Sequence, residues 1–192
     1  YTNNSKLVTV LWNEIEQKHS ESHRFYHTLE HLHNLLQQLK NVKTAINDWD
    51  AQMFTLFYHD SIYDPQQSDN EEKSAELAEK CMKRASVPTE MIEHCKNQIL
   101  ATKSHSKSAD SDTNYFTDAD LSILGQAWDV YSLYYKNVRK EYAVFEDAIY
   151  NPGRKNVLNH FLSMNRIYKT DRFYNKFEKQ AKFNLEQEFN IL

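Results

Sequence analysis

Histidines, aspartates or both occur at three places along this chain that could supply ligands to one metal ion. His59 and Asp60 follow the apolar run 53–58, where a buried carboxylate without a partner would cost several kcal/mol. His27 and His31 lie upstream, and two further aspartates lie downstream within the segment 117–121. A divalent cation held among these groups would offset the cost of burying them and would also supply chemistry.

Neutral imidazoles and ionised carboxylates together form a typical donor set for a divalent metal. This set suits Mn, Fe, Co, Ni, Zn or Mg, and it suits calcium less well. Because His27 and His31 are four residues apart, they would share one face of a helix. His59 and Asp60 are expected at the end of a second helix, and the aspartates of segment 117–121 at the start of a third.

The spacing of apolar residues predicts helices along most of the chain. They recur at helical intervals in the stretches 7–18, 29–39, 53–58, 75–82, 91–100, 128–150, 157–167 and 173–189. Only 2 Gly and 3 Pro occur among 192 residues, which argues against a sheet of many hairpins. The segment 105–114 is expected to be a mobile surface loop, with a short helix capped by Thr117 after it, and residues 151–153 are expected to end a helix. The predicted fold class is all-α: a single-domain irregular helical bundle over residues 1–192.

The composition argues against several classes of function. The formal charge of −4 gives no general attraction to nucleic acid or to an anionic membrane surface. No run approaches the ~18 apolar residues of a membrane span, and no signal-peptide pattern is visible. Cys81 and Cys95 form no Cys-x-x-Cys pair and are expected to be buried, reduced thiols of a cytoplasmic protein. The absence of a glycine-rich phosphate loop argues against a kinase or motor.

The order of the candidate ligands resembles a known signature. Arg24-x-x-His27, His59-Asp60 and Asp120 are similar to the ordered H…HD…D pattern of the HD-domain superfamily. Most of the chain also resembles one compact subgroup, described as predicted metal-dependent phosphohydrolases. The segments that carry this resemblance are Arg24-Phe25-Tyr26-His27 with His31, Tyr58-His59-Asp60-Ser61-Ile62-Tyr63-Asp64, Asn70-Glu71-x-x-Ser74-Ala75, Ala101-Thr102-Lys103-x-His105, and Gly153-Arg154 with Val157-Leu158.

The resemblance implies a helical fold of the HD-domain type that binds a divalent metal ion. The ligands that it implies are His27, His59, Asp60 and Asp120. His31 is the alternative to His27, and Asp118 is the alternative to Asp120. The implied activity is hydrolysis of a small phosphoester, for example a nucleotide, with metal-bound water as the nucleophile.

Other residues are candidates for catalysis or for binding the substrate. Those that would aid proton transfer are Glu71, His31 and Asp64. Those that would hold an anionic phosphoryl group are Arg24, Lys103, His105, Arg139 and Arg154. Each has a structural alternative, since an acid suits a helix N-terminus and an arginine in a helical protein commonly pairs with a carboxylate.

Two other functions stay open at the level of the sequence. One is a di-iron oxygenase with the HD fold, because His31 and His105 add imidazoles to the ligand set. The other is a regulatory module that binds a metal or nucleotide without turnover. The expected partner is a small phosphorylated molecule, and the aromatic C-terminal helices allow a homodimer. Histidines outside the motifs, His19 among them, are expected to be solvated.

Overall fold

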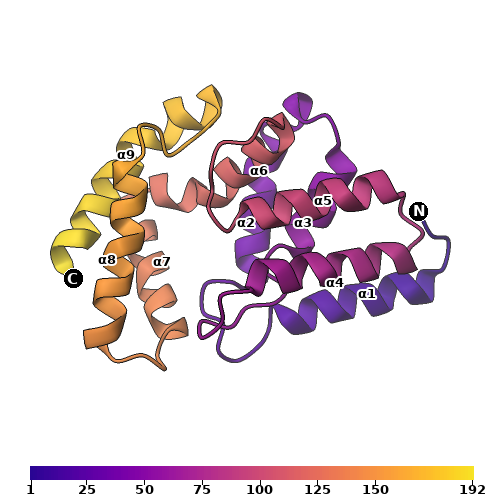
Figure 1. The fold of residues 1–192 in the computed structure, drawn as a ribbon, viewed down its shortest axis with the longest axis horizontal. Helices are drawn as coiled ribbons and strands as arrows, with labels where there is room; N and C mark the ends of the chain where they lie inside the picture. The colour runs from indigo at the N-terminus through magenta and orange to yellow at the C-terminus, as the bar shows by residue number, and fades with distance from the viewer. The chain divides into compact units, whose positions relative to one another are not determined.

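The computed structural model describes all 192 residues as nine α-helices and two 3₁₀ helices, without a β-strand, which confirms the all-helical prediction (Figure 1). The elements are α1 (Ser5–Lys18), α2 (Leu29–Lys40), η1 (Lys43–Ala45), α3 (Trp49–Tyr58), α4 (Asn70–Arg84), α5 (Thr89–Ala101), α6 (Ser111–Asp120), η2 (Leu121–Gly125), α7 (Trp128–Glu141), α8 (Asp147–Ser163) and α9 (Asp171–Ile191). None of these helices is long and apolar enough to cross a membrane.

The chain folds into two compact units, Tyr1–Thr117 and Asp118–Leu192. The division falls inside α6, so no linker of distinct composition separates them. The sequence therefore contains no linker segment that would mark this division.

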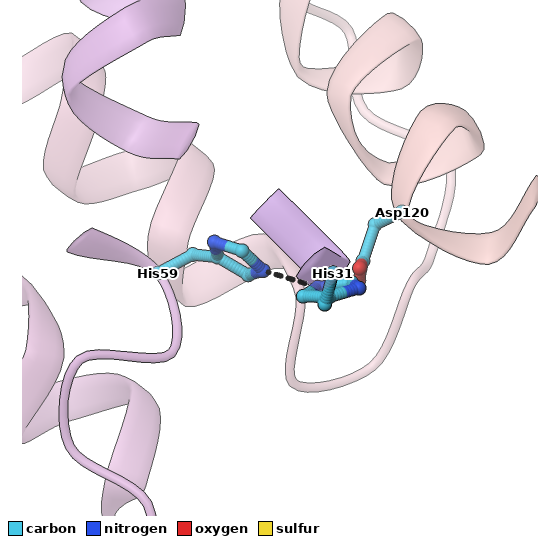
Figure 2. A group of neighbouring side chains, drawn as sticks. All are labelled: His31, His59 and Asp120. Carbon is cyan, nitrogen blue, oxygen red and sulfur yellow. Dashed lines mark hydrogen bonds between the residues drawn. The ribbon is translucent and has the colours of Figure 1, made fainter. Parts of the chain in front are cut away.

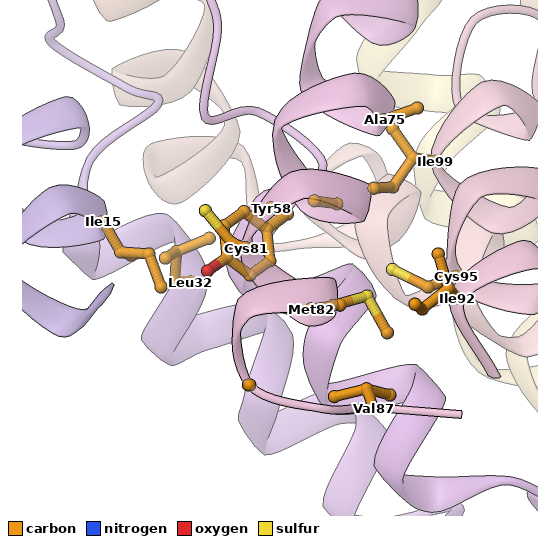
Figure 3. Close-up of a cluster of buried hydrophobic side chains, with 12 residues drawn as sticks. Ile15, Leu32, Tyr58, Ala75, Cys81, Met82, Val87, Ile92, Cys95 and Ile99 are labelled. Atoms are coloured by element: carbon orange, nitrogen blue, oxygen red, sulfur yellow. The ribbon is translucent and has the colours of Figure 1, made fainter. Parts of the chain in front are cut away.

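The core of the first unit lies where α3, α4 and α5 pack together. Figure 3 shows part of this cluster, in which Tyr58, Met82 and Ile99 come from three different helices. Cys81 and Cys95 are buried free thiols in the same cluster, as predicted. Burial raises the pKa of Cys95 to about 12, so this thiol is protonated at neutral pH and is a poor nucleophile.

Helix α6 begins earlier than the sequence predicts. Asp110 accepts a hydrogen bond from the backbone N–H of Thr113 at 2.8 Å, and this cap starts the helix at Ser111. The buried carboxylate of Asp112 in the first turn accepts the backbone N–H groups of Asn47 and Asp48. The expectation of a loop through residue 114 is therefore wrong. As a consequence, Thr117, Asp118 and Asp120 lie in the last turns of a helix, not at its start.

The second unit contains η2, α7, α8 and α9. Its core is rich in aromatic side chains, and the rings of Tyr168, Phe173 and Phe177 lie within 6.4 Å of one another, centroid to centroid. Gly125 allows η2 to approach α9 closely, because a Cβ atom there would lie only 2.5 Å from the Cβ atom of Phe177. The backbone contact thus requires glycine at this position.

The predicted helix over residues 128–150 is divided into two helices. Helix α7 ends at Glu141, because the Arg139 guanidinium binds the carbonyl groups of Tyr142 and Phe145 and closes a turn there. Helix α8 then runs through residues 151–153, which contradicts the expected break. Pro152 lies only one turn inside α8, so the proline removes a single backbone hydrogen bond.

Candidate metal centre

His59 lies at the C-terminal end of α3 and is 1% exposed. Its Nδ1 atom is 3.0 Å from the carbonyl oxygen of Leu56. A carbonyl can only accept a hydrogen bond, so Nδ1 carries a proton, and in the neutral ring Nε2 is the nitrogen that offers a lone pair to a metal ion. This is the tautomer that a metal-binding histidine needs, fixed by a backbone contact one turn earlier in the helix.

His31 lies in the first turn of α2 and brings a second imidazole to the same place. Its Nε2 atom is 3.2 Å from Nε2 of His59. His31, His59 and Asp120 each offer a ligand atom, and these atoms lie within 4.8 Å of one another. Figure 2 shows the two rings with the carboxylate of Asp120, the last residue of α6, beside them. These three side chains form a group that could hold a metal ion.

Asp60 supplies a carboxylate next to both rings. Its Oδ2 atom is 3.0 Å from Nε2 of His59 and 3.5 Å from Nε2 of His31. Burial by itself would raise the pKa of Asp60, but the charge of His59 and hydrogen bonds from His31 and His59 hold it well below its usual range. The carboxylate is therefore ionised at neutral pH and available as a donor to a cation.

The spacing of these atoms fits a shared metal ion. Donors about 2.0–2.1 Å from a tetrahedrally coordinated ion lie about 3.3 Å from one another. The distances among the nitrogens of His31 and His59 and the oxygen of Asp60 are 3.0, 3.2 and 3.5 Å. Two imidazoles and ionised carboxylates also form the mixed donor set of Mn, Fe, Co, Ni or Zn sites. Both the geometry and the chemistry of these residues are thus compatible with the implied cofactor.

Arg24 fixes the backbone around this group. Its buried guanidinium donates to the carbonyl oxygens of His27, Asp60 and Ser61 at 3.1, 2.7 and 3.2 Å, and to the carboxylate of Glu21 at 3.2 Å. The Arg-x-x-His spacing therefore has a structural reason, because the Arg24 side chain connects the segment before α2 to the end of α3 by hydrogen bonds. The structure gives Arg24 this positioning role, and substrate binding by Arg24 stays a prediction.

His27 precedes α2, which begins at Leu29, so the expectation that His27 and His31 share a helix face is wrong. Thr28 occupies the N-cap position in extended backbone, which separates His27 from the helix. The ring of His27 lies 5.8 Å from that of His31 and 4.1 Å from that of Tyr63, centroid to centroid. His27 is thus next to the group, and its role as a ligand stays a prediction.

Asp118 and Asp120 have different surroundings although both belong to the last turn of α6. The buried carboxylate of Asp118 accepts the backbone N–H groups of Lys169 and Thr170 at 2.8 and 2.7 Å, and the Thr170 hydroxyl at 2.7 Å. These three donors anchor the segment before α9. Asp120, in contrast, belongs to the group with His31 and His59, and its role as a ligand stays a prediction.

The loop after His59-Asp60 is held by side chains of the segment Asn70-Glu71-x-x-Ser74-Ala75. The Ser74 hydroxyl contacts both the N–H and the carbonyl of Ile62, and the Asn70 side chain does the same for Asp64. Glu71 stands in the first turn of α4, partly exposed, where an acid complements the helix dipole. Proton transfer by Glu71 or Asp64 stays a prediction.

Four predicted phosphate-binding residues occupy varied places. Lys103 donates to the carboxylate of Glu72 and to the carbonyl of Ser68, and His105 adopts a left-handed conformation, with φ of 51°, just after α5. In the second unit, Arg139 pairs with Asp147 at 2.7 Å. Arg154 makes two hydrogen bonds, at 2.7 and 2.9 Å, to the buried carboxylate of Glu188, which also accepts the Tyr131 hydroxyl. Both arginines thus have structural carboxylate partners.

His19 is the buried histidine that the sequence analysis missed. It is 1% exposed, and neither ring nitrogen has a hydrogen-bond partner, so the expectation of a solvated side chain is wrong. Burial and, to a smaller extent, the nearby charge of Arg24 lower its pKa to about 4. The signal was present in the sequence, because His19 follows the buried Ile15 by four residues and so lies on the core face of α1.

Comparisons with known proteins add no family to this description. No family model, no curated protein and no solved structure matches the chain.

Proposed function

We propose that this chain is a metal-dependent hydrolase of a small phosphoester, with a fold of the HD-domain type. The observation that supports the proposal is the convergence of the His31, His59 and Asp120 ligand atoms, with Asp60 in contact with both rings. Imidazoles and carboxylates brought together in this way form a donor set that a divalent cation would bind.

Some of these residues would hold the ion, and the exposed side of the group would admit the substrate. A bound divalent ion lowers the pKa of a coordinated water and neutralises charge on a phosphoryl oxygen. The Leu56 carbonyl holds the proton of the neutral His59 ring on Nδ1, which would leave Nε2 for the ion, and Arg24 holds the backbone of Asp60. The side chains of His31 and His59 are 4% and 1% exposed, whereas that of Asp60 is 22% exposed. A substrate would therefore approach from the side of Asp60.

Metal analysis of protein purified without a chelator tests the first half of this proposal. We expect about one equivalent of a divalent transition metal per chain, and a large loss of metal in His31→Gln and in His59→Gln. The matched control is His33→Gln, which changes an exposed histidine on the same helix as His31 and should retain the metal. Equal metal content in all four proteins would refute the metal site.

Phosphate release from a panel of nucleotides and simple phosphoesters tests the second half. We expect turnover by the metal-loaded protein that is lost in His59→Gln and kept in His33→Gln. Metal-loaded protein that stabilises on binding nucleotides but releases no phosphate would favour a regulatory module instead. Two iron ions per chain with oxygen consumption would favour an oxygenase. Either result would overturn the hydrolase proposal.

A further inference from the structure

One buried cation in the second unit lacks a hydrogen-bond partner. The side chain of Lys169 is 4% exposed, and its Nζ atom makes no hydrogen bond. The nearest carboxylate oxygen, Oδ1 of Asp118, is 3.7 Å away, beyond hydrogen-bond distance, and that carboxylate already accepts three donors. An ammonium with three unused donors is expensive to bury, so the arrangement calls for an explanation.

The backbone around Lys169 is held firmly in place. The N–H groups of Ile167 and Tyr168 donate to the buried carboxylate of Glu178, and the Tyr168 hydroxyl donates to the carbonyl of Leu121 at 2.9 Å. The next two N–H groups donate to Asp118. The backbone of Lys169 is thus fixed from both sides before any ligand binds.

The location of Lys169 relates it to the candidate metal centre. Asp118 fixes it against the last turn of α6, which ends at Asp120. The carboxylate nearest to the ammonium is that of Asp118, at 3.7 Å, and Asp118 precedes Asp120 by two residues in α6. A cation beside a predicted metal ligand is suited to an anion that the metal would also hold.

We propose that Lys169 is a substrate-binding residue whose Nζ atom donates hydrogen bonds to a non-bridging phosphoryl oxygen at the Asp120 end of α6. Identifying this anion as the substrate rests on the proposed function. Lysine serves as a compact point charge for phosphate, and a phosphoryl oxygen accepts the donors that the protein leaves unused. No motif of the sequence analysis included this residue.

Binding of inorganic phosphate to the full chain, measured by calorimetry with and without added Mn²⁺, tests the inference. We expect Lys169→Met to weaken phosphate binding by about tenfold or more and Lys169→Arg to weaken it less, since a charged hydrogen bond is lost only in the first. The matched control is Lys179→Met, which removes an exposed lysine of α9 and should leave the affinity unchanged. Should Lys169→Met fail to fold, Lys169→Gln, which keeps a polar donor without the charge, replaces it.

The outcomes separate this inference from the proposed function. Phosphoester hydrolysis by the wild type together with unchanged phosphate affinity in Lys169→Met would overturn the role of Lys169 and leave the hydrolase proposal standing. Phosphate binding that depends on Lys169 in a protein that hydrolyses no phosphoester would support the anion site and count against the hydrolase. Failure of the wild type to bind phosphate under any of these conditions would overturn the inference.

Discussion

Acidification should destabilise this protein through His19, before most of its carboxylates become protonated. The imidazole is buried without a hydrogen bond, and its pKa is about 4 in the folded chain against 6.5 for an exposed histidine. A depressed pKa means that the unfolded chain takes up this proton at a higher pH than the folded chain does. Between about pH 6.5 and pH 4, stability therefore falls as the pH falls.

The size of the effect follows from the two pKa values. At about pH 4.5, the difference in proton binding at His19 corresponds to roughly 2.5 kcal/mol of lost unfolding free energy. This is a large fraction of the 5–15 kcal/mol that typically stabilises a domain. The His19→Leu variant cannot titrate at this position, and at neutral pH it should be at least as stable as the wild type, because it removes a buried polar group that has no partner.

Urea unfolding in the presence of chelator, at about pH 7 and about pH 4.5, measures this effect directly. The wild type should lose roughly 2–2.5 kcal/mol more than His19→Leu between the two conditions. His33→Leu, at an exposed histidine, is the control and should lose as much as the wild type. If wild type and His19→Leu lose the same amount, the imidazole is hydrated or paired in solution, and the reasoning is refuted.

Three further predictions concern packing, positioning and the metal. Gly125→Ala should lower the unfolding free energy by roughly 2–3 kcal/mol because its Cβ would collide with Phe177, whereas Gly153→Ala, with no atom within 4 Å, should raise it by about 0.5–1 kcal/mol. Thermal or urea melts that rank the two alike would contradict this. Arg24→Met should cost about 3 kcal/mol and reduce bound metal, since it leaves buried carbonyls unpaired; intact metal content by elemental analysis would count against its positioning role. Chelation should lower the melting temperature by several degrees, reversibly on adding metal, and identical melting curves would argue against a bound ion.

The sequence predicted the helices well where their signals are local. Apolar periodicity located the core faces of α4 and α5, and His59 does lie at the end of a helix. In α3 the fully buried face includes the polar Gln52 and Thr55, whereas Phe54 and Phe57 are only partly buried. The boundaries that were wrong depend on particular side-chain contacts. The Asp110 cap starts α6 early, and Asp112 joins that first turn to residues 47 and 48, which are far away in the sequence. Helix α7 ends early because Arg139 binds carbonyls of the following turn, a contact that apolar periodicity does not reveal.

The candidate site was only partly predictable for a similar reason. The residue types and their order indicated a cluster of imidazoles and carboxylates, and the choice between neighbouring candidates depended on the local backbone. Thr28 places His27 outside α2, and the three donors around Asp118 distinguish it from Asp120. The side-chain nitrogens of His19 and Lys169 have no hydrogen-bond partner. This property depends on the residues that surround them in three dimensions, so the sequence could not predict it.

Helix α6 imposes a strict limit on length variation in this protein. Asp112 and Asp120 are eight residues apart on this helix, and each has its own partners. One inserted residue would rotate everything beyond it by about 100°, turning Asp120 away while Asp112 kept its contacts. Natural variants should therefore carry insertions and deletions in the segments 102–110 and 142–146 and none between positions 112 and 120, and an engineered single-alanine insertion there should abolish metal binding while the first unit still folds.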